Sequence, residues 1–253
     1  MTELTEAAST QAPLSETQRC IDIFTAPTKT FIDIRRKATF WGPLIVMIIV
    51  GIGFSFTVQK KIGWEQVFQN NMRQAPATLE KIESNPKAES IKAGYIKGGA
   101  ISSYLYWVLV LLITLITSLL IWVSINFGFG GKAKYSQIYA VSLYSGLVMN
   151  IKFLLGIVAI FAGLAPESFL INNPVGSNIG YYLSTDSPAW LRILCTQIDI
   201  FQIWAIVLSV IGVSVVAKVS KGKSAAVVVG WSIIIVLVFT TIAAVASKIN
   251  HPR

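Results

Sequence analysis

Five long runs of apolar residues alternate with shorter polar connections along the chain. Each run approaches or exceeds the roughly 20 residues that an α-helix needs to cross a bilayer, and only two charged residues fall within them. A soluble core does not require runs of this length, so the pattern predicts an all-α, polytopic membrane helix bundle with five transmembrane helices. We expect the spans at Trp41–Val58, Ser103–Phe127, Ile138–Leu164, Ile198–Ala217 and Ala225–Ala246.

The segment before the first span predicts a tail followed by short amphipathic helices. Residues 1–14 are mostly polar and are expected to be disordered. Ser15 suits a helix N-cap and Pro27 suits the first turn of a second helix, so residues 15–38 predict two cytoplasmic interfacial helices. An apolar face that ends in a basic cluster is typical of helices on an anionic membrane surface. We therefore expect lipid-surface contacts from Phe31, Arg35, Arg36 and Lys37.

Residues 39–247 are expected to form the membrane domain, with a short tail at 248–253. Within this domain, residues 60–100 are expected to form an extracytoplasmic connection, and they carry apolar side chains at three- and four-residue steps, interrupted by Pro76. The spacing predicts two short amphipathic helices that rest either on the membrane or on the bundle.

The short connections indicate the orientation of the chain. Residues 127–137 contain two lysines and no acid, and residues 218–224 contain three lysines, whereas the connection between the third and fourth spans has Arg192 as its one basic residue. An excess of lysine and arginine marks the cytoplasmic side, so we expect a cytoplasmic N-terminus and an extracytoplasmic C-terminus. Counted over all segments outside the spans, basic residues divide equally, ten on each side. Short connections receive more weight because longer segments influence orientation less.

Composition supports a membrane protein. Of 253 residues, 54% are hydrophobic and 13% are charged, against roughly a quarter charged in soluble domains. This excludes a disordered chain and a small disulfide-rich domain. The net charge is +9, and the basic residues responsible for it lie mostly between the apolar runs. This placement favours anionic headgroups over nucleic acid as the partner. The sequence contains no N-x-[ST] acceptor, which favours a bacterial inner membrane.

Signatures of enzymes and metal sites are missing from the sequence. The one histidine, His251, lies three residues from the end, which excludes a Ser-His-Asp arrangement and a histidine-based metal site. Cys20 and Cys195 occupy different parts of the topology and indicate neither a disulfide framework nor a metal pattern. We therefore expect a non-enzymatic protein without a cofactor or metal.

Two charged residues inside the spans give the strongest residue-level signal. Lys152 lies in the third run and Asp199 near the start of the fourth, where a lone charge costs about 3 kcal/mol or more. One interpretation is an intramembrane binding site for a solute or proton. The others are a salt bridge that fixes helix register, or a lysine that extends to the membrane surface. The candidate binding residues are Lys152, Asp199, Asn150, Gln202 and Trp204.

Several short segments resemble a known family. The stretch Asp199-Ile200-Phe201-Gln202-Ile203-Trp204, together with Ile23-Phe24-Thr25-Ala26-Pro27 and Trp41-Gly42-Pro43-Leu44, is similar to bacterial Yip-domain (Ypt-interacting protein) membrane proteins. The resemblance implies a domain of five spans with a cytoplasmic N-terminus. Eukaryotic members are associated with Rab-type GTPases and vesicle traffic, but this chain lacks their Asp-Leu-Tyr-Gly-Pro motif. For bacterial members the resemblance implies no established reaction.

Two functional hypotheses follow. The first is a non-enzymatic adaptor or membrane-organising protein that binds anionic lipid and partner membrane proteins or itself. Small residues four apart, such as Ala226 and Gly230, would allow a partner helix to approach closely. The alternative is a small solute or proton transporter or channel that uses Lys152 and Asp199.

Overall fold

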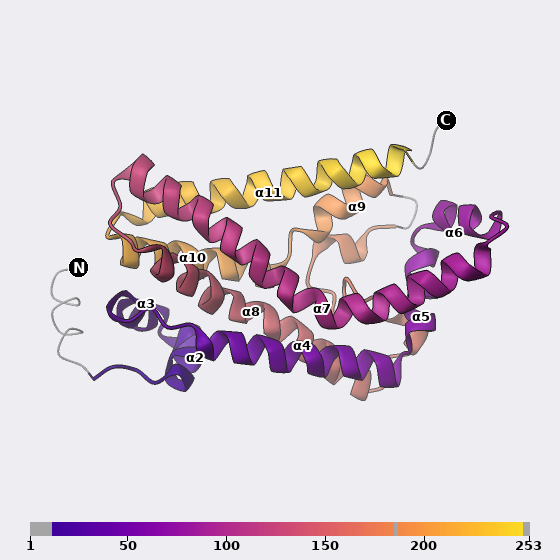
Figure 1. Ribbon diagram of the computed structural model, residues 1–253, viewed down its shortest axis with the longest axis horizontal. Helices are drawn as coiled ribbons and strands as arrows, with labels where there is room; N and C mark the ends of the chain where they lie inside the picture. The colour runs from indigo at the N-terminus through magenta and orange to yellow at the C-terminus, as the bar shows by residue number, and fades with distance from the viewer. Residues whose placement is uncertain (1–11, 185–186, 250–253) are drawn as a thin grey trace. The chain divides into compact units, whose positions relative to one another are not determined.

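The computed structural model describes residues 12–184 and 187–249, and this part of the chain is almost entirely helical (Figure 1). Both expected tails fall largely outside the described residues. Within them, five helices are long and apolar enough to cross a membrane, which confirms the predicted fold class. They are α4 (Trp41–Lys61), α7 (Ala88–Val123), α8 (Tyr135–Phe161), α10 (Ile200–Ala217) and α11 (Lys221–Ile249).

Helix α7 differs most from its predicted span. It begins at Ala88 rather than Ser103 and continues through a π-helical turn, Ser124–Gly128, so that 41 residues are helical. At 1.5 Å per residue this is about 60 Å, twice the roughly 30 Å hydrocarbon thickness of a bilayer. The first part of α7 therefore extends beyond the membrane. Hydropathy locates the apolar part of a helix but says nothing about its continuation into water.

Short helices occupy the segments between the spans. Helices α2 (Glu16–Thr25) and α3 (Pro27–Arg36) precede the first span, and α5 (Trp64–Arg73) and α6 (Pro76–Glu83) fill the predicted 60–100 connection. Helix α9 (Ala189–Thr196) follows the 3₁₀ turns η2 (Pro166–Ser168) and η3 (Ile179–Tyr182). Ser15 caps α2, because its Oγ accepts a hydrogen bond of 3.1 Å from the Gln18 N–H. Pro27 and Pro76 open their helices, where a missing N–H has no consequence.

The chain divides into two compact units. Unit 1 comprises residues 12–48, 109–149 and 201–235 of the described chain, and unit 2 comprises residues 49–108, 150–200 and 236–249, apart from 185–186. The boundaries fall inside α4, α7, α8 and α11, which each contribute to both units, and just after Ile200, the first residue of α10.

In unit 1, α3 packs inward rather than onto a membrane surface. Phe31 is fully buried, and its ring lies against Gly212 of α10, where an added Cβ would approach the ring to 2.8 Å and Val141 of α8 to 2.5 Å. The expectation that Phe31 contacts lipid therefore does not match its position in this structure. The exposed apolar side chains of this region are instead Ile21 and Phe24 on α2.

Unit 2 contains two hydrophobic clusters. The first joins α4, α5, α8 and the segment after η2, through Phe54, Val58, Val67, Ile160 and Phe169. The second lies where α5 and α6 meet the first turns of α7, and is made of Phe68, Met72, Leu79, Ile82, Ile91 and Ile96. Of the two predicted resting places for α5 and α6, the structure supports packing on the protein's own helices.

One helix contact in unit 2 depends on the absence of a side chain. Gly51 of α4 faces the indole of Trp107 on α7, and an added Cβ would lie 1.8 Å from the ring. A glycine at such a crossing lets two transmembrane backbones approach closely. Gly53, two residues along the same helix, has nothing within 4 Å of its added Cβ and provides a matched control.

We expect Gly51→Ala to lower the free energy of unfolding by about 1–3 kcal/mol, because the rigid indole must shift to accept a methyl group. Gly53→Ala should be neutral or slightly stabilising, since alanine favours a helix and meets no neighbour. Both variants are compared by SDS titration with helicity followed by circular dichroism. Equal stability of the two variants would contradict the close crossing.

Candidate functional site

Lys152 and Asp199 meet in unit 2, as the sequence suggested they could. The Lys152 Nζ lies 2.8 Å from Asp199 Oδ2, and both side chains are buried. Lys152 comes from the middle of α8, and Asp199 immediately precedes α10. Because each charge has its counter-ion, neither stands alone at depth. The salt-bridge interpretation therefore describes the observed geometry, whereas the transport alternative stays a sequence-based prediction.

A small polar framework holds Asp199 in place. The Ser177 Oγ donates to Asp199 Oδ2 at 2.6 Å, and Asn178 and Asp199 form an isolated antiparallel β-bridge. The Ile200 N–H donates to the Ser177 carbonyl at 3.1 Å. Buried Asn173 and Asn178 pair through their side-chain amides, with the Asn173 Nδ2 donating to Asn178 Oδ1 at 3.0 Å. Both the backbone and the side chain of Asp199 are therefore held by contacts other than the ion pair with Lys152.

Three further candidate binding residues, Asn150, Gln202 and Trp204, do not all lie in the cluster around Asp199. Asn150 is buried on α8, two residues before Lys152. Gln202 and Trp204 belong to unit 1. The Trp204 ring packs edge-on against Phe24 of α2, with the ring centroids 5.9 Å apart.

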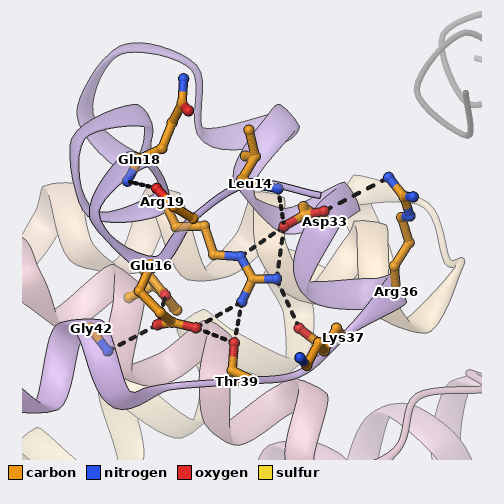
Figure 2. A network of polar contacts seen from close by, with 11 residues as sticks. Leu14, Glu16, Gln18, Arg19, Asp33, Arg36, Lys37, Thr39 and Gly42 are labelled. Carbon is orange, nitrogen blue, oxygen red and sulfur yellow. Dashed lines mark hydrogen bonds and ion pairs between the residues drawn. The ribbon is translucent and has the colours of Figure 1, made fainter. Parts of the chain in front are cut away.

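A second polar cluster, in unit 1, centres on buried Arg19 (Figure 2). Its Nε donates to Asp33 Oδ2 at 2.8 Å, and an Nη2 ion pair to the same oxygen measures 2.7 Å. The Nη1 group donates to Glu16 Oε1 at 3.3 Å and to the Thr39 hydroxyl, and Nη2 donates to the Lys37 carbonyl at 3.1 Å. The guanidinium therefore ties α2 to α3 and to the segment that leads into α4.

Glu16 extends this cluster to the third span. Its Oε2 accepts hydrogen bonds from the Gly42 N–H at 2.9 Å and from the Tyr144 hydroxyl of α8 at 2.7 Å, while Thr39 donates to Oε1. Burial alone raises the pKa of Glu16, but the bonds from Thr39, Tyr144 and Gly42, with the charge of Arg19, leave the pKa below its ordinary value of 4.5. The carboxylate is therefore ionised at neutral pH, and it accepts four hydrogen bonds, from Arg19, Thr39, Gly42 and Tyr144.

Cys20 lies beside this cluster and is held as a thiol. Its Sγ would be 2.9 Å from a Cβ added at Gly42, and burial, followed by the charge of Glu16, raises its pKa to about 11. Since the thiolate is the reactive form, Cys20 is a poor nucleophile at neutral pH. Cys20 and Cys195 are both free.

In the sequence, Arg19 entered only the count of basic residues outside the spans, and Glu16, Asp33 and Tyr144 were not singled out. A signal was available in the helical spacing. Arg19 lies one turn before buried Ile23 on α2, and Asp33 lies directly before buried Ile34 on α3. Opposite charges on the apolar faces of two consecutive short helices indicate that these faces meet each other.

The predicted lipid-surface residues Arg35, Arg36 and Lys37 lie at the end of α3, with Arg36 and Lys37 exposed. Within unit 1, two other basic segments, residues 132–134 and 218–223, lie near the end of α3. The Gln137 side chain, at the start of α8, donates to the Arg35 carbonyl at 2.8 Å, and the Lys132 N–H donates to the Ala217 carbonyl at 3.1 Å. We call the resulting surface the basic end, made of Arg35, Arg36, Lys37, Lys132, Lys134, Lys218, Lys221 and Lys223.

The acids near the basic end are already engaged. Asp33 is bound by Arg19 and, at 3.8 Å, by Arg36 of the basic end; Asp22 pairs with Lys29 at 2.9 Å, and Glu16 accepts the bonds described above. The connections that carry the lysines of the basic end contain no acid. This surface therefore presents a concentrated positive charge.

These features define a multi-pass helical membrane protein. Among the described residues, no group of three or more His, Cys, Asp or Glu side chains is placed to hold a metal ion. Residues 21–243 match the Yip1 domain, and the chain belongs to this family. It is also 25% identical over 224 residues to "Membrane protein YknW" of Bacillus subtilis (strain 168), a match that covers 85% of this chain and 83% of that protein. No solved structure gives a significant match. The comparisons indicate no catalytic family.

The ion pair of unit 2 is tested by neutralising its members singly and together. Lys152→Met and Asp199→Asn should each lower the free energy of unfolding by about 3–5 kcal/mol, because each leaves an uncompensated buried charge. The double variant should lose much less than the sum of these values. Unfolding of the wild type and the three variants in SDS gives the four free energies of a double-mutant cycle. Additive losses would show that the two charges do not stabilise each other.

Proposed function

We propose that this protein is a non-enzymatic adaptor or membrane-organising protein of a bacterial inner membrane. Its N-terminus is cytoplasmic and its C-terminus extracytoplasmic. The basic end carries the proposal, because it gathers eight basic residues from three separate parts of the sequence on one surface. Such clusters next to transmembrane helices attract anionic phospholipids and mark the cytoplasmic side.

The 60–100 connection, which opposes this orientation by its charge count, differs in character. Its basic residues are interspersed with Glu65, Glu80, Glu83 and Glu89. Lys92 pairs with Glu65 at 2.8 Å, and Arg73 donates to the Glu167 carbonyl. This segment is therefore closer to balanced charge than the basic end. The difference supports a cytoplasmic basic end despite the equal totals.

The adaptor role also rests on α11. Ala226 and Gly230 lie one turn apart, Ala226 is exposed, and nothing approaches within 4 Å of a Cβ added at Gly230. Ile233 and Leu237 are exposed one and two turns further on. Small residues at this spacing permit close contact with another transmembrane helix. We assign this face, Ala226, Gly230, Ile233 and Leu237, to the helix of a partner membrane protein.

Lipid binding is tested with Lys37→Gln, Lys132→Gln and Lys221→Gln combined, one change in each segment of the basic end. Each lysine near an anionic surface contributes about 1 kcal/mol, so the three changes together should lower the enrichment of phosphatidylglycerol over phosphatidylcholine at least ten-fold. Enrichment is measured by native mass spectrometry of protein from mixed-lipid nanodiscs. A matched control neutralises exposed Lys81, Lys87 and Lys97 and should retain the wild-type enrichment. Equal losses in both variants would overturn a specific role for the basic end.

Partner binding is tested by photo-crosslinking in native membranes, with the probe at Ala226 on α11. We expect one discrete protein adduct. It should disappear in Gly230→Leu, because the leucine side chain occupies the space that the partner helix needs beside Gly230. A probe at Ile49, which is exposed on α4, serves as the lipid-facing control and should give no such band. If the Ala226 probe reacts with lipid alone, this face has no protein partner.

A further inference from the structure

The connection between α8 and α10 returns deep along α8 before the next span begins. Lys152, which holds Asp199, lies nine residues before Phe161, the last residue of α8. At 1.5 Å per residue this separation is about 13 Å. Asp199 directly precedes Ile200, where α10 starts. The chain therefore leaves α8 at Phe161 and descends beside the same helix by roughly this distance.

Between Lys152 and Phe161, α8 also has a face that carries exposed apolar side chains. Leu154 is 47% exposed, Val158 61% and Phe161 64%. Apolar side chains that project from a transmembrane helix at successive turns are placed in hydrocarbon, since nothing polar in that stretch would hold the helix in water. If the bilayer reaches Phe161, then Asp199 and the start of α10 lie inside it.

The connection has the internal hydrogen bonds that such a position requires. Irregular backbone is stable at membrane depth only where its polar groups find partners within the protein. The Ile179 N–H donates to the Ile198 carbonyl at 3.4 Å, and the Tyr181 N–H donates to Asn178 Oδ1 at 3.0 Å. The Tyr182 hydroxyl donates to the Gly176 carbonyl at 3.0 Å. Buried asparagines, which would be unnecessary in a water-exposed loop, complete this set.

The packing of η3 against α9 makes the connection compact. A Cβ added at Gly180 would lie 3.0 Å from the Arg192 carbonyl and still closer to Thr196. The β-bridge between Asn178 and Asp199 then joins η3 to the residue that directly precedes α10. The large hydrophobic side chains that the pair exposes are Ile179 at 49%, Tyr182 at 74% and Trp190 at 49%, while Arg192 of α9 is half-buried.

We propose that the described parts of the α8–α10 connection, residues 169–184 and 187–200, form a re-entrant membrane segment. Its occupant is lipid: Ile179, Tyr182 and Trp190 contact the acyl chains and the headgroup boundary of one leaflet. Tyrosine and tryptophan suit this boundary because their rings are apolar and their polar groups can reach water. The Lys152–Asp199 pair anchors the segment at depth. This inference is independent of the proposed adaptor role and of the orientation of the chain.

The experiment measures the surroundings of single side chains in liposomes. Cys20→Ala and Cys195→Ala remove the native thiols, and Tyr182→Cys or Trp190→Cys then carries an environment-sensitive NBD fluorophore. Quenching is compared for two agents, a doxyl-labelled phosphatidylcholine in the bilayer and iodide present on both sides. Val158→Cys on α8 is the lipid control, and Ser84→Cys, exposed at the end of α6, is the water control.

Both test positions should be quenched by the doxyl lipid at least half as strongly as position 158. Iodide quenching should be several-fold weaker than at position 84. Strong iodide quenching together with negligible doxyl quenching would overturn the proposal and place the connection in water. Both side chains are exposed, but Tyr182→Cys also removes the hydrogen bond to the Gly176 carbonyl, so Trp190→Cys is the decisive variant. Ile179→Cys gives the same readout if either variant fails to reconstitute.

Discussion

A polar group inside a bilayer has no water to bind, and the arrangement of this protein depends on how it meets that constraint. Lys152 and Asp199 would each be costly alone, but they lie 2.8 Å apart and Ser177 adds a third contact. Arg19 meets the same requirement outside the spans, where Asp33, Glu16, Thr39 and the Lys37 carbonyl surround its guanidinium. In both clusters most partners come from other elements of the chain, so satisfying the charge also fixes the fold.

The Arg19 cluster determines what the N-terminal helices can do. By joining α2 to α3 and, through Glu16, to Tyr144 of α8, it turns the apolar face of α3 toward the protein. Phe31 is buried as a consequence, and the end of α3 is held beside the lysines that precede α8 and α11. The same contacts that remove one predicted lipid contact thus assemble the positive surface that supports lipid binding.

The sequence predicts most of the fold because hydropathy directly distinguishes segments that are stable in hydrocarbon from segments that are stable in water. Five spans, two N-terminal helices and the helices on either side of Pro76 are all found. The pattern fails where that contrast is not informative. It cannot show that α7 continues to Ala88 outside the membrane, nor whether the apolar face around Phe31 meets lipid or protein. Lys152 and Asp199 were identifiable because charges in spans are rare, whereas Arg19 lies in a polar segment where a charged residue is ordinary.

The physical value of the Lys152–Asp199 pair lies in geometry more than in stability. Two apolar side chains of similar volume can stabilise a buried site as well as an ion pair does, because desolvation offsets much of the attraction. Apolar side chains, however, tolerate sliding along a helix. An ammonium and a carboxylate at 2.8 Å do not, since a shift of one turn would leave both unpaired. The pair therefore sets the level on α8 at which the connection stops descending. Because α10 begins at the next residue, the pair also sets the depth at which the fourth span starts.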